Sequence, residues 1–187
     1  GSLNIGKNNI NDITLKSLRE NIALVSQETF LFDGTISDNI SYPNLDAKFE
    51  DIKSVSKLSQ CDEFIDRFPL GYDTIIGERG QRLSVGQKQR ISIARAIIKD
   101  PSILIFDEAT SSVDNKTENL IQKSLKEISK NRTTIAIAHR LSTIRNADQI
   151  LVLDNGKIIE SGTHDELVLQ EGSYKYLWDL QTGLLDD

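Results

Sequence analysis

The chain has 187 residues, a length that suits one domain of ordinary size. Hydrophobic residues make up 38% of it and charged residues 27%, which is the composition of a globular protein with a core. The net charge of −6 argues against binding to nucleic-acid phosphates. No apolar run approaches the roughly 20 residues that span a bilayer, so we expect a chain that is soluble by itself. The single cysteine, Cys61, excludes an internal disulfide and fits a reducing compartment.

Apolar spacing and turn residues predict the elements of the first half of the chain. Two of them are strands and three are helices: strands at 2–6 and 22–25, and helices at 14–20, 46–67 and 85–99. Asp100 and Pro101 end the last of these helices, because proline cannot continue the hydrogen-bond ladder.

The sequence of the second half of the chain predicts a strand, a helix and a second strand. Residues 103–106 and 134–138 are apolar runs of the buried-strand type, and a polar-faced helix at 116–129 joins them. This order predicts a βαβ unit and therefore a parallel sheet. Farther on we expect a hairpin around Asn155-Gly156, a helix opened by a capping box at 163–166, and a last helix that ends near residue 185. The fold class is α/β, with a helical insert before the βαβ unit.

The front of the chain carries a near-match to a phosphate-binding loop. Gly1 to Asn8 almost spells G-x-x-x-x-G-K-[ST], but Asn8 stands where a hydroxyl should reach Mg²⁺. No strand precedes Gly1, and the residues after Lys7 are a poor start for the helix whose N-terminus must hold the phosphates. We therefore reject the phosphate-loop interpretation.

Two carboxylates follow the apolar run 103–106. Asp107 and Glu108 stand where the strand ends, and α/β sheets bind ligands at the carboxyl ends of their strands. An aspartate there can hold Mg²⁺ through water, and a glutamate can polarise a water molecule that attacks a phosphoryl group. A strand that simply ends in solvated acids explains the same pair.

The segment Leu83–Gln87 opens the predicted helix at 85–99. Ser84 is a good N-cap, and Gln87 completes a Ser-x-x-Gln capping box. The free amides, the backbone of Gly86 and the helix dipole would also form an anion site. Helix capping and anion binding use the same geometry here. The segment by itself therefore does not indicate a function, and its neighbours in the sequence are needed.

The order of these segments resembles the nucleotide-binding domain of an ABC transporter, most closely that of the exporter branch. The resemblance runs through Gln27, 83–87, Asp107-Glu108, 111–114 and His139, and it covers essentially the whole chain. It implies a parallel-sheet core of the P-loop NTPase type.

The same resemblance implies one partial ATP-binding domain over residues 1–187. A helical subdomain that carries the signature motif would lie inside it, at about residues 40–100. It also implies that ATP and Mg²⁺ are bound.

The family's roles are carried over to the residues that match its motifs. Gln27 matches the glutamine that senses Mg²⁺ and the attacking water and that links to the membrane domain. Ser84, Gly86 and Gln87 match the signature loop, which caps the γ-phosphate of ATP bound to the opposite subunit. Val85 departs from the glycine that is commoner at its position, which could alter the affinity for phosphate.

The remaining matches follow the second half of the chain. Asp107 corresponds to the Mg²⁺-associated aspartate and Glu108 to the catalytic base. Asp114 ends the loop that crosses the dimer interface, and His139 matches the switch histidine that contacts the γ-phosphate. His164, inside a helix cap, is expected to be a surface residue.

Two further segments resemble the exporter surfaces that meet the membrane domain. Residues 74–80 are similar to the loop that touches its coupling helices, and residues 30–36 to the surface that receives one. The partners implied are therefore a transmembrane domain and a second nucleotide-binding domain, in a homodimer or a heterodimer, and no nucleic acid. The parent protein would lie at the cytoplasmic face of a membrane.

The family's phosphate loop, its lysine and its adenine-stacking aromatic are not found in this sequence. We expect a domain that lacks its front and that alone neither binds ATP tightly nor hydrolyses it. In the family the strand before the phosphate loop would lie beside 103–106, so its loss predicts an exposed edge and self-association.

Two other functions remain open. An ATPase of the chromosome-maintenance and DNA-repair group shares these motifs, but a long coiled coil would have to fit between Gln27 and Ser84. Only 57 positions separate those residues, and they carry no sustained heptads. A non-catalytic module that dimerises through 83–87 is the other alternative. The transported substrate cannot be read from this chain.

Overall fold

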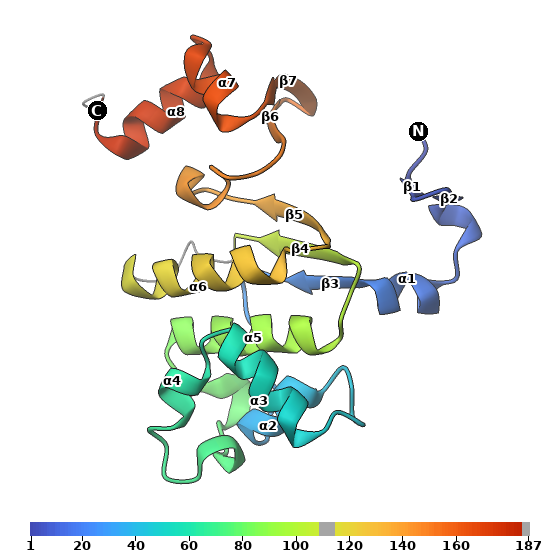
Figure 1. Cartoon of the computed structure of the whole chain (residues 1–187), viewed down its shortest axis with the longest axis vertical. Helices are drawn as coiled ribbons and strands as arrows, with labels where there is room; N and C mark the ends of the chain where they lie inside the picture. The colour runs from blue at the N-terminus through green and yellow to red at the C-terminus, as the bar shows by residue number, and fades with distance from the viewer. Residues whose placement is uncertain (109–114, 185–187) are drawn as a thin grey trace. The chain divides into compact units, whose positions relative to one another are not determined.

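The computed structural model describes residues 1–108 and 115–184 (Figure 1). The chain forms two compact units, Gly1–Ile137 and Ala138–Asp187, and each is described by itself. Among the described residues, no helix has both the length and the apolar character needed to cross a membrane.

The first unit alternates short strands and helices. Its elements, in chain order, are β1 (Asn4–Ile5), β2 (Asn8–Asn9), the 3₁₀ turn η1 (Ile10–Asp12), α1 (Leu15–Asn21), β3 (Ile22–Val25), α2 (Ile36–Ser41), α3 (Phe49–Leu58), α4 (Asp62–Ile65), η2 (Gly71–Asp73), η3 (Glu78–Gly80), α5 (Val85–Ile98), β4 (Ile103–Asp107), α6 (Asn115–Ile128) and β5 (Thr133–Ile137). The predicted strands and long helices of this half are therefore present, and the predicted strand at 2–6 is the first arm of a small antiparallel hairpin.

A parallel sheet in the order β3–β4–β5 forms the centre of this unit within the described residues. Val25 pairs with Phe106, and Asp107 pairs with Ile137. The βαβ prediction is confirmed. The predicted place of the missing strand beside β4 is wrong, because β3 and β5 occupy both sides of β4. The open edges of this sheet are those of β3 and β5.

The two faces of the sheet differ in how much of their surface is buried by other elements. Side chains alternate along a strand, so Ala23, Val25, Leu104 and Phe106 share the face that is buried with α5 in the main core. On the other face, Leu24, Ile135 and Ile137 have 59%, 50% and 54% of their surface exposed. The prediction of a buried strand at 134–138 is therefore wrong, because burial of an apolar run requires cover on both faces.

Helices α2, α3 and α4 pack around α5 and complete the main core. The helical stretch predicted over 46–67 is divided into α3 and α4. Between them Gln60 takes a left-handed φ of 59°, which ends one helix before the next begins. Helix α2 opens with a capping box in which Thr35 and Asp38 each accept a backbone hydrogen bond from the other residue.

The second unit contains η4 (Leu141–Thr143), β6 (Ile150–Asp154), β7 (Lys157–Gly162), α7 (His164–Leu169) and α8 (Ser173–Thr182). The predicted hairpin is confirmed, and both turn residues have the positive φ that a type I′ turn needs, 47° at Asn155 and 74° at Gly156. The capping box of Thr163 and Glu166 is also present.

His164 is the exception to the predictions for this unit. It was expected at the surface, but its ring is buried against Tyr174 and Trp178. Its Nδ1 lies 2.9 Å from the Tyr174 hydroxyl. The capping position fixes the start of α7, but only the return of α8 onto α7 places aromatic rings over the histidine.

Candidate functional site

The carboxyl ends of β3 and β4 bring three predicted site residues to one edge of the sheet. The strands are parallel and Val25 pairs with Phe106, so Gln27, Asp107 and Glu108 all follow the same end of the ladder. Gln27 is exposed, and both acids are half-buried. This is the edge at which open α/β sheets bind ligands.

Glu108 has an unusual backbone for an acidic residue. Its φ is 49°, in the left-handed region, and its N–H donates to the Ile137 carbonyl at 2.9 Å. Such a conformation costs about 1–3 kcal/mol in a residue other than glycine and is concentrated at functional sites. The hydrogen bond to the end of β5 holds the chain in this sharp turn directly after Asp107.

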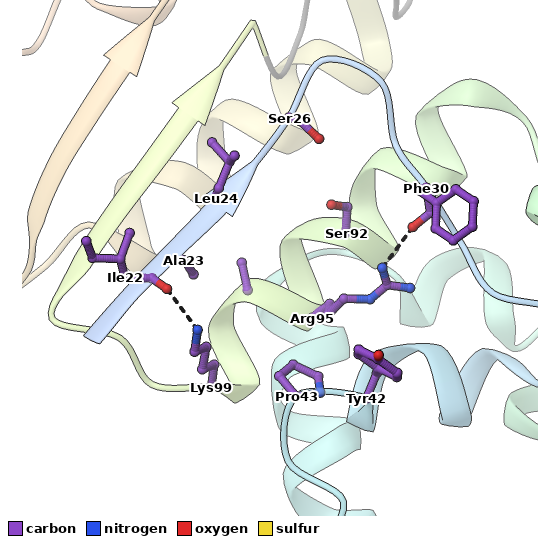
Figure 2. A pocket seen from close by; sticks show the side chains of 11 residues that line it. Ile22, Ala23, Leu24, Ser26, Phe30, Tyr42, Pro43, Ser92, Arg95 and Lys99 are labelled. Carbon is purple, nitrogen blue, oxygen red and sulfur yellow. Dashed lines mark hydrogen bonds between the residues drawn. The ribbon is translucent and has the colours of Figure 1, made fainter. Parts of the chain in front are cut away.

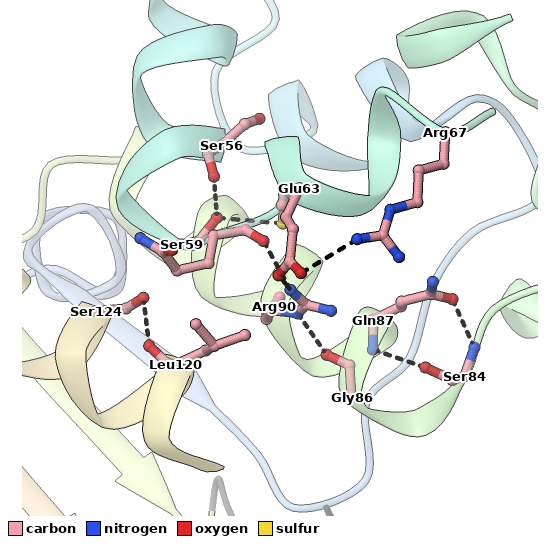
Figure 3. A network of polar contacts seen from close by, with 12 residues as sticks. Ser56, Ser59, Glu63, Arg67, Ser84, Gly86, Gln87, Arg90, Leu120 and Ser124 are labelled. Carbon is pink, nitrogen blue, oxygen red and sulfur yellow. Dashed lines mark hydrogen bonds and ion pairs between the residues drawn. The ribbon is translucent and has the colours of Figure 1, made fainter. Parts of the chain in front are cut away.

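The start of α5 is capped by its own side chains (Figure 3). The Ser84 hydroxyl accepts from the Gln87 N–H at 3.3 Å, and the Gln87 side-chain oxygen accepts from the Ser84 N–H at 2.9 Å. The predicted capping box is therefore present. It does not use the amides of Val85 and Gly86, which lie in the first turn of a 14-residue helix with its positive dipole end.

Gly86 is packed closely against α6. A Cβ built on it would lie 2.6 Å from Cγ2 of Thr117, a residue of α6, and real Cβ atoms essentially never approach so closely. The sequence suggests that this glycine lets a phosphate approach the backbone. The structure adds a second reason, because α6 already occupies the space of a side chain.

Arg90 ties the first turn of α5 to the corner between α3 and α4 (Figure 3). Its guanidinium donates to the carbonyl oxygens of Gln60 at 2.8 Å and of Gly86 at 3.4 Å. It also pairs with Glu63 at 3.3 Å and lies over the Phe64 ring. No motif points to Arg90. The available signal is a charged residue four positions after Gly86, on the same side of the helix.

Two further predicted site residues do not belong to the described part of the first unit. His139 belongs to the second unit, where its side chain is exposed and its carbonyl oxygen accepts from the Gln181 side chain at 2.6 Å. Asp114 lies outside the described residues.

The two segments predicted to meet a membrane domain lie side by side. The Ile36 N–H donates to the Thr74 carbonyl at 3.1 Å, and the Ile76 N–H donates to the Gly34 carbonyl at 3.0 Å. Residues 30–36 and 74–80 are thus joined by a short antiparallel bridge. Two predictions made from separate parts of the sequence therefore fall on one surface.

Three exposed aromatic side chains mark that surface. Phe30 and Phe32 meet edge to face with ring centres 5.3 Å apart, and Phe32 stacks on Tyr42 at 4.3 Å. We call Phe30, Phe32 and Tyr42 the aromatic patch. Exposed apolar groups gathered in this way are typical of a surface that binds a partner.

A cavity of about 300 Å³ lies between this patch and β3 (Figure 2). Phe30 and Tyr42 line it together with Arg95 of α5 and Lys99, which caps the end of that helix. Arg95 donates to the Phe30 carbonyl at 2.8 Å and to the Asn39 carbonyl at 2.9 Å, and burial lowers the pKa of its guanidinium. Lys99 donates to the Ile22 carbonyl at 2.9 Å. Both cationic side chains that line the cavity are thus hydrogen-bonded to backbone carbonyl groups.

The model of the ABC transporter family matches residues 1–111, which is more than half of the chain. The chain belongs to the ABC transporter family. It is 54% identical over 97% of its length to an ABC transporter ATP-binding protein, YknU, of Bacillus subtilis, and it spans 31% of that protein. It is 49% identical, over the same share, to an ATP-dependent lipid A-core flippase of Desulfotalea psychrophila, and spans 32% of it.

The fold of this ABC transporter chain is similar to that of a solved relative. The structure of a bacterial Atm1-family ABC exporter with ATP bound superposes with a TM-score of 0.86 at 44% identity. The match covers 92% of this chain and 30% of the exporter chain. The α/β class with a P-loop NTPase-like core is thereby confirmed, and the chain spans about 30% of the length of the relatives it matches.

The chemistry of this sheet edge can be compared with what a Mg²⁺ site requires. Within the described residues, no three His, Cys, Asp or Glu side chains gather into a metal cluster. Mg²⁺ does not need one, because it is usually held by one or two carboxylates together with substrate phosphates and water. Asp107, half-buried at the sheet edge, and the exposed Gln27 carry oxygen atoms of the kind that such a site uses.

Proposed function

We propose that this chain is a large part of the nucleotide-binding domain of an ABC exporter, in which ATP hydrolysis is coupled to export of a substrate across a membrane. The carboxyl edge of the sheet carries the proposal, because it gathers Gln27, Asp107 and Glu108 with the N-terminal half of α5. The exporter and flippase names of the relatives support the transport part of the proposal.

Each residue at the edge has a role that its chemistry suits. Glu108, turned sharply away from β4, would act as the general base that takes a proton from the attacking water. Asp107 and Gln27 would hold Mg²⁺ with oxygen ligands, and Mg²⁺ neutralises charge that develops on the phosphates. His139 would contact the γ-phosphate, and a neutral imidazole or an imidazolium can donate a hydrogen bond to it.

The start of α5 suits a phosphate that belongs to a second nucleotide-binding domain. The box formed by Ser84 and Gln87 holds the first turn rigidly, and the amides of Val85 and Gly86 stand at the positive end of the helix dipole. Both box residues are exposed or half-buried, so this turn is accessible to a partner. Asp114 would lie at the same dimer interface.

The aromatic patch would receive the coupling helices of a transmembrane domain. It is supported from beneath by Arg95 and Asn39, and Ile75 adds an exposed apolar side chain on the adjoining segment 74–80. A firm apolar surface of this kind suits a short amphipathic helix. The domain would then lie at the cytoplasmic face of the membrane.

A chimera tests the proposed activity. The matched region of the Desulfotalea psychrophila flippase is replaced by this chain, and ATP hydrolysis is measured in purified protein. We expect hydrolysis, and we expect Glu108→Gln to lower kcat by at least about 100-fold, the usual contribution of a general base. A chimera that folds and dimerises without hydrolysing ATP would contradict the proposal and favour a non-catalytic interaction module.

The 187-residue chain alone is proposed to bind ATP weakly and not to hydrolyse it. Its near-match to a phosphate loop lies in the hairpin β1–β2, where Asn4 pairs with Asn9 and Gly6 takes a positive φ of 58°. Titration of this polypeptide with Mg-ATP by calorimetry checks the expectation. Binding in the micromolar range would overturn it.

A further inference from the structure

Gln89 is a buried polar residue that none of the predicted motifs includes. It lies in the first half of α5, five positions after Ser84, and only 3% of its surface is exposed. Its side-chain oxygen accepts from the Thr29 hydroxyl at 2.5 Å, and its side-chain nitrogen donates to the Ser26 carbonyl at a longer 3.5 Å. Both ends of the amide therefore contact a segment that is 60 residues or more away in sequence.

That segment contains Gln27. Ser26 and Thr29 flank Gln27 and Glu28, and residues 27–29 belong to no helix or strand. The Ser26 hydroxyl donates to the Glu28 carbonyl at 3.0 Å, which closes a small turn with the exposed Gln27 at its outer side. A loop of this kind takes its order from the contacts at its ends. Gln89 provides one contact at each end.

The same helix holds the continuation of the segment. Figure 2 shows the chain from Ser26 to Phe30 running along α5, with the Phe30 carbonyl accepting from Arg95. Gln89 and Arg95 are six positions apart, so successive turns of α5 contact successive parts of this segment. The Gln27 loop and the aromatic patch thus rest on one helix.

We propose that Gln89 is the positioning residue of Gln27: it fixes the loop on α5, the helix whose first turn carries Ser84 and Gly86. The proposal deepens the proposed function, because it concerns how a residue near the nucleotide is held. A movement imposed on the loop or on the aromatic patch would then reach the first turn of α5 through a side-chain amide, without any change in secondary structure.

The test measures the order of the Gln27 loop in the ¹⁵N-labelled 187-residue chain, without nucleotide. Gln89→Leu removes both hydrogen bonds at similar volume, and Thr29→Val removes the hydroxyl donor while keeping its shape. We expect backbone order parameters at Gln27 and Glu28 to fall from about 0.85 to below about 0.6 in each variant. Thr29→Ser, which keeps the hydroxyl, should retain the order of the parent chain.

Ile91→Val is the matched control for general loosening of α5, since Ile91 is fully buried in the main core. It should leave the order of the loop unchanged. Unchanged order parameters in Thr29→Val, or an equal fall in Ile91→Val, would overturn the proposal, even if Gln89→Leu failed to fold. Failure of the chimera to hydrolyse ATP would contradict the proposed function and leave this result untouched.

Discussion

Helix α5 and strand β5 belong to the same unit, yet their surroundings are opposite. Ile91, Ile93 and Ala94 of α5 are fully buried, whereas Ile135 and Ile137 of β5 are half exposed. β5 is held by its parallel ladder with β4, and α5 is held by helices and sheet together. Regular hydrogen bonding is therefore not a measure of packing: the stability of this unit is concentrated around α5.

Substituting the same residue type in the two elements gives the largest expected difference. Ile93→Ala removes a fully buried side chain from α5 and should lower the free energy of unfolding by about 2–5 kcal/mol. Ile135→Ala, at a half-exposed position, should cost below about 1 kcal/mol. Urea denaturation of both variants measures the difference. Equal losses would show that β5 is as well covered as α5.

A second substitution tests how closely α5 is packed. Gly86→Ala should destabilise the chain by about 1–3 kcal/mol, because the added methyl group overlaps Cγ2 of Thr117. Thr117→Ser removes that carbon and should recover most of the loss in the double variant. The coupling between the two substitutions, measured by urea denaturation, is the readout. Additive effects would argue that the close approach is absent in solution.

The pH dependence of stability reports how dry the core around α5 is. Burial raises the pKa of the Cys61 thiol to about 12 from 9.0. A raised thiol pKa means that the folded state keeps its proton, so this contribution is present below pH 9 and is lost as the pH rises toward 12. At pH 10 the loss should be about 1.4 kcal/mol. Unfolding of the parent chain and of Cys61→Ala between pH 8 and pH 10 separates it from other groups, and parallel curves would refute it.

The smallest effect on stability is expected at the exposed face of β5. Ile135→Thr with Ile137→Thr keeps β-branched side chains and should change the free energy of unfolding by less than about 1 kcal/mol. The same change should reduce self-association, because an open strand edge with apolar side chains favours pairing between chains. Light scattering at high concentration tests this. A parent chain that stays monomeric would show that β5 is covered in solution.

Local signals predicted the parts of the fold whose causes are local. The Ser84 and Gln87 box, the Asn155-Gly156 turn and the proline that ends α5 each act within a few residues, and all three are present. Likewise, the apolar run before Asp107 predicted a strand that ends in acids.

The failures concern neighbours that are distant in sequence. An apolar run does not show which faces of a strand are covered, so β5 was predicted to be buried. His164 was predicted to be exposed, but it is buried against Tyr174, which belongs to another helix, and the local sequence does not reveal this contact. For the site, motifs indicate Gln27 and Glu108 but not Arg90 or Gln89, whose roles depend on carbonyl groups brought near by folding.

The approach of Thr117 to Gly86 affects how a set of related sequences should be interpreted. A related sequence that lacked Asp107 and Glu108 would still be destabilised by a side chain at this position, because the penalty arises within one folded chain. Retention of this glycine in related sequences is therefore explained by the close packing of α5 against α6. Its presence in a relative is therefore no evidence by itself that a phosphate binds at this turn.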